Sequence, residues 1–98
     1  MRILLANWLD LRNPQAGGAE VHLFEIFRRL AARGHQVHLV CSGWRGAAPR
    51  ETVDGIEVSR VSTRYRYALH GRAAVRAAIA RVDPDIVCED INKLPLFL

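Results

Sequence analysis

Short runs of hydrophobic residues along the chain predict β-strands. Nearly continuous apolar runs are typical of strands covered on both faces, and alternating runs are typical of strands with one solvated face. The segments with one of these patterns are residues 2–7, 37–41, 56–61 and 85–88. Asp54 and Gly55 form a turn signal between Thr52-Val53 and the third of these segments. We therefore expect four strands.

Helical spacing of apolar residues appears in two segments between these strands. The first helix is expected to begin at Ala19 and to stop at Gly34. Its core-facing positions are Leu23, Phe24, Phe27, Leu30 and Ala31. The second helix is expected over residues 68–82, an alanine-rich segment that ends before Pro84. Its expected core contacts are Leu69, Val75, Ile79 and Val82.

The order of these elements favours a parallel sheet. It is strand, helix, strand, strand, helix, strand, and helices between buried strands indicate right-handed crossovers. We therefore expect an α/β fold with a doubly wound parallel sheet, in which the first strand lies between the second and the last. Cys41 and Cys88 then lie about two strand spacings apart, roughly 9.6 Å. Because that distance exceeds the reach of a disulfide, both are expected to be free thiols.

The length of the chain allows one small domain and no second one. Its 98 residues end in a largely apolar stretch, residues 92–98, that has no predicted packing partner. A four-stranded half-sheet also leaves its last strand as an exposed hydrophobic edge. We therefore expect the N-terminal part of a longer protein. No apolar run approaches the roughly 20 residues of a membrane span, and the run before Asn7 is too short for a signal peptide, so we expect an intracellular, soluble protein.

Positive charge is concentrated in one segment of the chain. The sequence has 14 Lys and Arg against 10 Asp and Glu, and residues 60–81 contain arginines but no acidic residue. These arginines are Arg60, Arg64, Arg66, Arg72, Arg76 and Arg81. Such a block attracts nucleic acid, anionic lipid or a phosphorylated substrate. The alternative is a solvated basic helix in a protein that favours arginine throughout.

Cysteine and histidine are too few and too scattered to predict a metal site. Both cysteines lie in apolar runs, as is typical of small buried side chains. His22 and Glu25 are three residues apart on the predicted first helix, but a pair alone does not form a tetrahedral site. We therefore expect no metal ligand.

A pair of glycines directly before the first helix is the most informative candidate for a binding site. Ligands of open α/β sheets bind beyond the carboxyl ends of the strands, and Gly17 and Gly18 follow the first strand at that edge. Glycines let a ligand approach the backbone, and the N–H groups of Gly17, Gly18 and Ala19 favour a phosphate or another anion. The alternative is a turn that needs glycine only for a positive φ. The segment lacks both the P-loop sequence and the spacing of a GxGxxG fingerprint.

Polar side chains near the same edge are further candidates. Glu20 lies in the middle of the apolar arc of the first helix, so its carboxylate needs a hydrogen-bonding partner or a cleft. It either positions a sugar hydroxyl or braces the glycine loop, or it is a partly exposed residue or caps its own helix. Asp90 and Asn92 follow the last strand, where they either meet a polyol or belong to a solvated loop. Glu89 and Asp90 point to opposite faces as strand neighbours, which argues against a catalytic acid–base pair.

Several segments together resemble the N-terminal domain of family-four glycosyltransferases. They are MRILLAN at residues 1–7, NPQAGGAE at residues 13–20, LAARGH at residues 30–35, DGIEV at residues 54–58 and PDIV at residues 84–87. Each segment alone is loosely specific, whereas the combination runs nearly end to end. The resemblance implies a GT-B fold, in which two Rossmann-like domains face each other across a cleft. Residues 1–98 would be an incomplete N-terminal, acceptor-side domain, with no second domain in this chain.

The same resemblance implies an activity and its co-substrate. Members transfer a sugar from a nucleotide diphosphate sugar to an acceptor, usually with retention of configuration and without a metal, so we expect no other cofactor. Gly17 and Gly18 match the loop that approaches the donor diphosphate. The catalytic-region histidine and the paired glutamate motif of the family have no counterpart in residues 1–98. No catalytic residue is therefore assigned, and this segment alone is expected to be inactive.

The resemblance also bears on the basic segment. Some relatives bind anionic membranes through basic N-terminal surfaces, and Tyr65 and Tyr67 would suit such an interface. The candidate contacts are Arg64, Arg66, Arg72 and Arg76. The protein would then be cytoplasmic and peripheral at the inner face of the membrane. The rival interpretation is a standalone Rossmann-like binding module that uses residues 60–81 for nucleic acid, anionic lipid or a protein partner. Nucleic acid is the weakest of these, because no recognised RNA or DNA motif is present.

Overall fold

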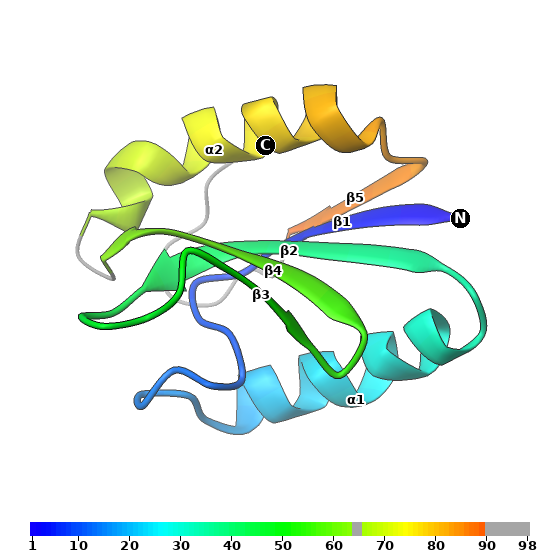
Figure 1. The fold of residues 1–98 in the computed structure, drawn as a ribbon, viewed down its shortest axis with the longest axis horizontal. Coiled ribbons are helices and arrows are strands. Elements are labelled where there is room, and N and C mark those ends of the chain that lie inside the picture. Colours follow the sequence, from blue (N-terminus) through cyan, green and yellow to red (C-terminus); the bar gives the residue numbers. More distant parts are fainter. Residues whose placement is uncertain (64–65, 90–98) are drawn as a thin grey trace.

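A mixed sheet lies at the centre of the structure, with one helix packed on each face (Figure 1). The computed structural model describes residues 1–63 and 66–89. The elements in chain order are β1 (Arg2–Ala6), α1 (Gly18–Ala32), β2 (Gln36–Gly43), β3 (Arg50–Val53), β4 (Ile56–Thr63), α2 (Tyr67–Val82) and β5 (Ile86–Glu89). The expected α/β class is confirmed, and the arrangement is Rossmann-like, with helices on both faces of the sheet.

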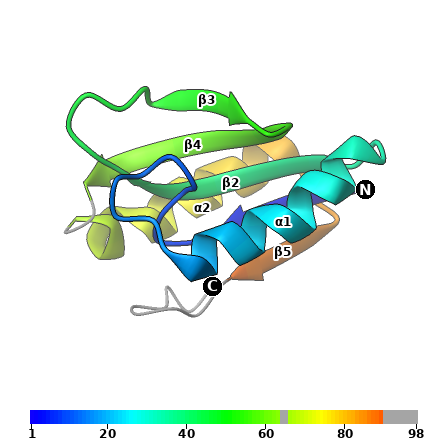
Figure 2. The same cartoon turned by 90° about the horizontal axis from the view of Figure 1, so that it is seen from below.

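The strands are hydrogen-bonded in the order β3-β4-β2-β1-β5. β1 pairs in parallel with β2 on one side and with β5 on the other, which confirms that the first strand lies between the second and the last. Figure 2, seen from below, shows α1 in front of the sheet, with β3 at one edge and β5 at the other. Cys41 on β2 and Cys88 on β5 are separated by β1, and both are free thiols as expected.

The expectation of four parallel strands is wrong at one edge. β3 is an additional strand, and it pairs antiparallel with β4 from Arg50 opposite Ser59 to Val53 opposite Ile56. Asp54 and Gly55 join the two strands with φ of 52° and 80°. Positive φ at both central residues is the signature of a tight hairpin turn, which Asp-Gly favours. The turn predicted at Asp54 and Gly55 is confirmed, but the polar residues before it concealed β3 from the hydrophobic pattern.

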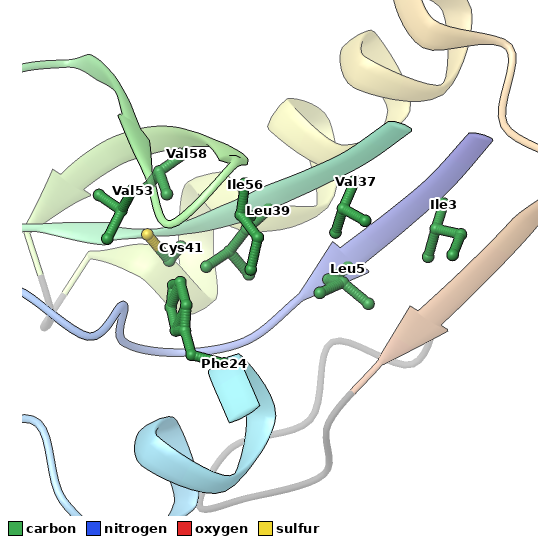
Figure 3. Packing of buried hydrophobic residues seen from close by; sticks show 9 residues of the cluster. All are labelled: Ile3, Leu5, Phe24, Val37, Leu39, Cys41, Val53, Ile56 and Val58. Carbon is green, nitrogen blue, oxygen red and sulfur yellow. The ribbon is translucent and has the colours of Figure 1, made fainter. Parts of the chain in front are cut away.

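Hydrophobic side chains fill the space on both faces of the sheet. Along β1, Ile3 and Leu5 point toward α1, and Leu4 and Ala6 point toward α2. Phe24 of α1 is 1% exposed and packs into the first cluster. Figure 3 shows this cluster, which is formed by Ile3, Leu5, Phe24, Val37, Leu39, Cys41, Val53, Ile56 and Val58. The predicted apolar arc of α1 therefore faces the sheet, with Leu23, Phe27, Leu30 and Ala31 at its margin.

The predicted core face of α2 is only half right. Val75 and Val82 are buried as expected, but Leu69 is 77% exposed and Ile79 is 39% exposed. The helix begins one residue earlier than expected, and its first residue, Tyr67, is buried and donates its hydroxyl hydrogen to the carbonyl of Val40 at 3.1 Å. Two positions along a helix correspond to a turn of about 200°. Anchoring Tyr67 in the core therefore turns Leu69 outward.

β5 is only partly covered. Cys88 packs against the hydrophobic cluster on the α1 side, but neither helix lies close along the strand. Ile86 and Val87 are each 41% exposed. Within the described residues, the last strand is therefore an exposed hydrophobic edge, as the sequence predicts.

Candidate functional site

The loop between β1 and α1 lies at the carboxyl edge of the sheet and is held by its own polar side chains. Asn7, Asp10 and Asn13 are all buried. A carboxylate oxygen of Asp10 accepts the N–H of Arg12 at 3.1 Å, and the amide oxygen of Asn13 accepts the N–H of Gln15 at 2.9 Å. Such local bonds replace regular backbone pairing in turns. The chain therefore reaches the glycine pair through a loop whose conformation is fixed by these hydrogen bonds.

Glu20 is the buried carboxylate that joins this loop to the helix. It is 3% exposed, so its predicted orientation toward the core is confirmed and the partly exposed alternative is wrong. Its Oε1 accepts the N–H of Gly17 at 2.8 Å, and its Oε2 accepts a hydrogen bond from Nδ2 of Asn7 at 3.3 Å. The bond to Gly17 is the reciprocal half of a capping box. Capping the helix and bracing the glycine loop are therefore the same interaction.

The glycine pair has open space around it. Gly17 has a φ of −133°, and neither glycine has a positive φ, so the interpretation as a strained turn is wrong. A Cβ atom placed on either residue would meet no atom within 4 Å beyond its chain neighbours. The first bond of the helix runs from the N–H of Val21 to the carbonyl of Gly17. The N–H groups of Gly18 and Ala19 precede it, and such groups have no acceptor within their helix.

A pocket of about 220 Å³ lies beside the start of α1. It is lined by residues from β1, α1 and β5, among them Leu5, Ala19, His22, Leu23, Cys88 and Glu89. His22 did not stand out in the sequence as a pocket residue. The available signal was its position three residues after Ala19, which places both on one side of the helix. The pocket opens at the carboxyl ends of β1 and β5, where an α/β sheet binds its ligands.

Arg60 does not belong to the exposed basic surface. Its side chain is 2% exposed and pairs with Asp10, which is fully buried. Hydrogen bonds to Asp10 raise the pKa of Arg60, so the guanidinium remains charged. The expectation that all of residues 60–81 form one basic face is therefore corrected. Sequence reasoning missed this pair because its members are 50 residues apart.

The remaining described arginines of this segment are exposed. Arg66 lies directly before α2, Arg72, Arg76 and Arg81 lie on it, and α2 contains no acidic residue. Arg64 and Tyr65 lie outside the described residues. Tyr67 is buried, so the expectation that it meets a membrane is wrong, and the same burial raises the pKa of its hydroxyl. No described helix is long and apolar enough to cross a membrane.

The proposed roles of Asp90 and Asn92 stay predictions, because both residues lie outside the described part of the chain.

Cys41 is enclosed in the core, where burial raises the pKa of its thiol and keeps it protonated. Within residues 1–63 and 66–89, no three His, Cys, Asp or Glu side chains form a group that could hold a metal ion.

Comparison with known proteins supports the resemblance found in the sequence. A family model described as Glycosyltransferase Family 4 matches residues 16–96, which is most of the chain. The match begins directly before Gly17. No curated protein and no solved structure matches the chain.

Replacing Glu20 by alanine is expected to lower the free energy of unfolding by about 1–3 kcal/mol, because the N–H of Gly17 loses its partner inside the protein. Urea unfolding measures this loss. Glu25→Ala is the matched control on the same helix, since Glu25 is half-exposed and pairs only with Arg28 and Arg29 at the surface. Equal, small losses in the two variants would contradict the assigned role of Glu20.

Proposed function

The chain belongs to glycosyltransferase family 4, and we propose that its glycine pair contacts the diphosphate of a nucleotide sugar from which the enzyme transfers a sugar to an acceptor. The observation that supports this most is the open N-terminus of α1. Gly17 and Gly18 present no side chains there, and neither the backbone conformation nor the packing of the described residues requires glycine.

Physical chemistry favours an anion at this position. The aligned peptide dipoles of a helix place about half a positive charge at its N-terminus, and α1 is 15 residues long. Glu20 engages the N–H of Gly17, which leaves the N–H groups of Gly18 and Ala19 for a ligand. A phosphate oxygen can approach these groups closely because no Cβ stands in front of Gly18.

The finer parts of the proposal follow from the family. Residues 1–98 form part of the acceptor-side domain of a GT-B enzyme, and transfer proceeds with retention and without a metal. The pocket of about 220 Å³ beside α1 is a suitable place for part of the acceptor, with polar groups from His22 and Glu89 among apolar side chains. Asp90 and Asn92 are proposed to bind hydroxyl groups nearby. Catalytic groups come from other parts of the enzyme, so this segment alone is inactive. We place the enzyme in the cytoplasm.

Gly18→Val is expected to weaken the binding of nucleoside diphosphates to the full-length protein by at least about tenfold, or about 1.4 kcal/mol. Valine fits the space at this position and forms helix better than glycine, so the variant is expected to fold. Titration calorimetry with UDP, GDP and ADP measures the loss.

Ala32→Val is the matched control, because it adds a branched side chain at the exposed opposite end of the same helix. It is expected to bind as the wild type does. If Gly18→Val also retained full affinity, the glycine pair would not be the diphosphate site.

A second function, contact with an anionic membrane, is favoured by the surface of α2. Its three exposed arginines, Arg72, Arg76 and Arg81, have no ion pair within the described part of the chain, and Leu69 is 77% exposed on the same helix. A basic residue near an anionic bilayer contributes about 1 kcal/mol of attraction. We propose that α2 brings the enzyme to the inner face of the membrane.

Replacing both Arg72 and Arg76 by glutamate is expected to lower binding to phosphatidylglycerol vesicles by at least about tenfold at low salt, because attraction becomes repulsion. Vesicle sedimentation measures this change, with phosphatidylcholine vesicles as the uncharged comparison. Arg33→Glu with Arg45→Glu changes the net charge equally on exposed residues outside α2. Equal losses in the two double variants would show an effect of net charge alone and refute the role of α2.

A further inference from the structure

Arg60 and Asp10 form a buried ion pair. Nη2 of Arg60 lies 2.8 Å from Oδ2 of Asp10, and Nε lies 3.2 Å from Oδ1. The side chains are 2% and 0% exposed. Two parallel bonds between a planar guanidinium and a carboxylate hold both groups in one relative orientation. The pair therefore ties β4, which carries Arg60, to the loop that carries Asp10.

The same guanidinium also holds the loop between β2 and β3. Nη1 of Arg60 donates to the carbonyl of Ala48 at 3.1 Å and lies 2.7 Å from Oε1 of Glu51. The guanidinium carbon is 4.6 Å from the centre of the Trp44 ring, a distance typical of a cation–π contact. Both loops follow the carboxyl ends of their strands, so Arg60 joins two loops at the edge of the sheet where the candidate site lies.

Stability alone is a weak reason for such an arrangement. The free energy lost by removing two charges from water is similar to the free energy gained from their attraction. Apolar residues of the same volume often give an equally stable protein. What the ion pair adds is a fixed geometry. The carboxylate of Asp10 also accepts the N–H of Arg12, in the turn that precedes Asn13 and the glycines. The orientation of Asp10 therefore fixes the conformation of the loop that follows it.

We propose that Arg60 and Asp10 are positioning residues that hold the loop between β1 and α1 in the conformation that presents Gly17 and Gly18 to the donor diphosphate. This inference rests on the proposed function for the ligand, but the placement of the loop can be tested without one. Arg60 lies too deep to contact the diphosphate itself, and it acts through Asp10.

The test compares Arg60→Lys with Arg33→Lys in the full-length protein. Lysine keeps the charge but loses the paired bonds to Asp10, and Arg33 is an exposed residue at the far end of α1 that serves as the matched control. In ¹H–¹⁵N spectra without ligand, Arg60→Lys is expected to shift the amide signals of Gly17 and Gly18, and Arg33→Lys to leave them in place. With inorganic pyrophosphate as the probe, Arg60→Lys is expected to bind about tenfold more weakly.

Glu51→Gln provides a milder variant if Arg60→Lys does not fold, since Glu51 is partly exposed and contacts one end of the guanidinium. Glu51 also pairs with Arg12 of the same loop at 2.9 Å, so Arg12→Gln is measured beside it to separate the two contacts. Glu51→Gln is expected to shift the same two amide signals in the same direction and to weaken pyrophosphate binding by about two- to threefold. A folded Arg60→Lys or Glu51→Gln variant that leaves the signals of Gly17 and Gly18 unchanged would overturn the positioning role. Wild-type protein that binds no pyrophosphate would instead refute the proposed function, and the amide signals alone would then decide whether Arg60 positions the loop.

Discussion

Buried polar groups in the loop between β1 and α1 set the main constraint on this structure. Where the chain leaves a strand but stays buried, its backbone N–H and carbonyl groups need hydrogen-bond partners, because burying an unpaired polar group costs free energy. Asp10, Asn13 and Glu20 supply these partners within the loop and the first helical turn. The position of α1 over the sheet, and with it the position of the glycine pair, depends on these bonds.

The parallel sheet gives this loop its place. β1 lies between β2 and the edge strand β5, so the loop that follows it emerges at the carboxyl edge of the sheet beside β5. The helix then starts with open space around Gly17 and Gly18. A place at the carboxyl edge, N–H groups without an acceptor in their helix and a nearby pocket are the features on which the proposed binding of a nucleotide sugar rests.

Local patterns allowed most of the fold and one part of the site to be predicted. The apolar arc of α1 placed Phe24 in the core, and its interruption by Glu20 correctly marked a buried carboxylate. Features that depend on distant partners could not be predicted in this way. In the sequence, Arg60 belongs to a basic segment, and only the fold shows that it pairs with Asp10. Likewise, Leu69 points outward because the hydroxyl of Tyr67 bonds to the carbonyl of Val40. Helical spacing identified α2 but not its rotation, because alanines make several of its faces equally apolar.

A crystal structure of the full-length protein with a bound nucleoside diphosphate would show whether the start of α1 holds the diphosphate. We expect a phosphate oxygen about 2.7–3.2 Å from the backbone nitrogen of Gly18 or Ala19, in line with the N–H bond, with the carboxylate of Glu20 still bound to Gly17. A diphosphate held at another part of the enzyme, with the start of α1 left open to solvent, would contradict this expectation.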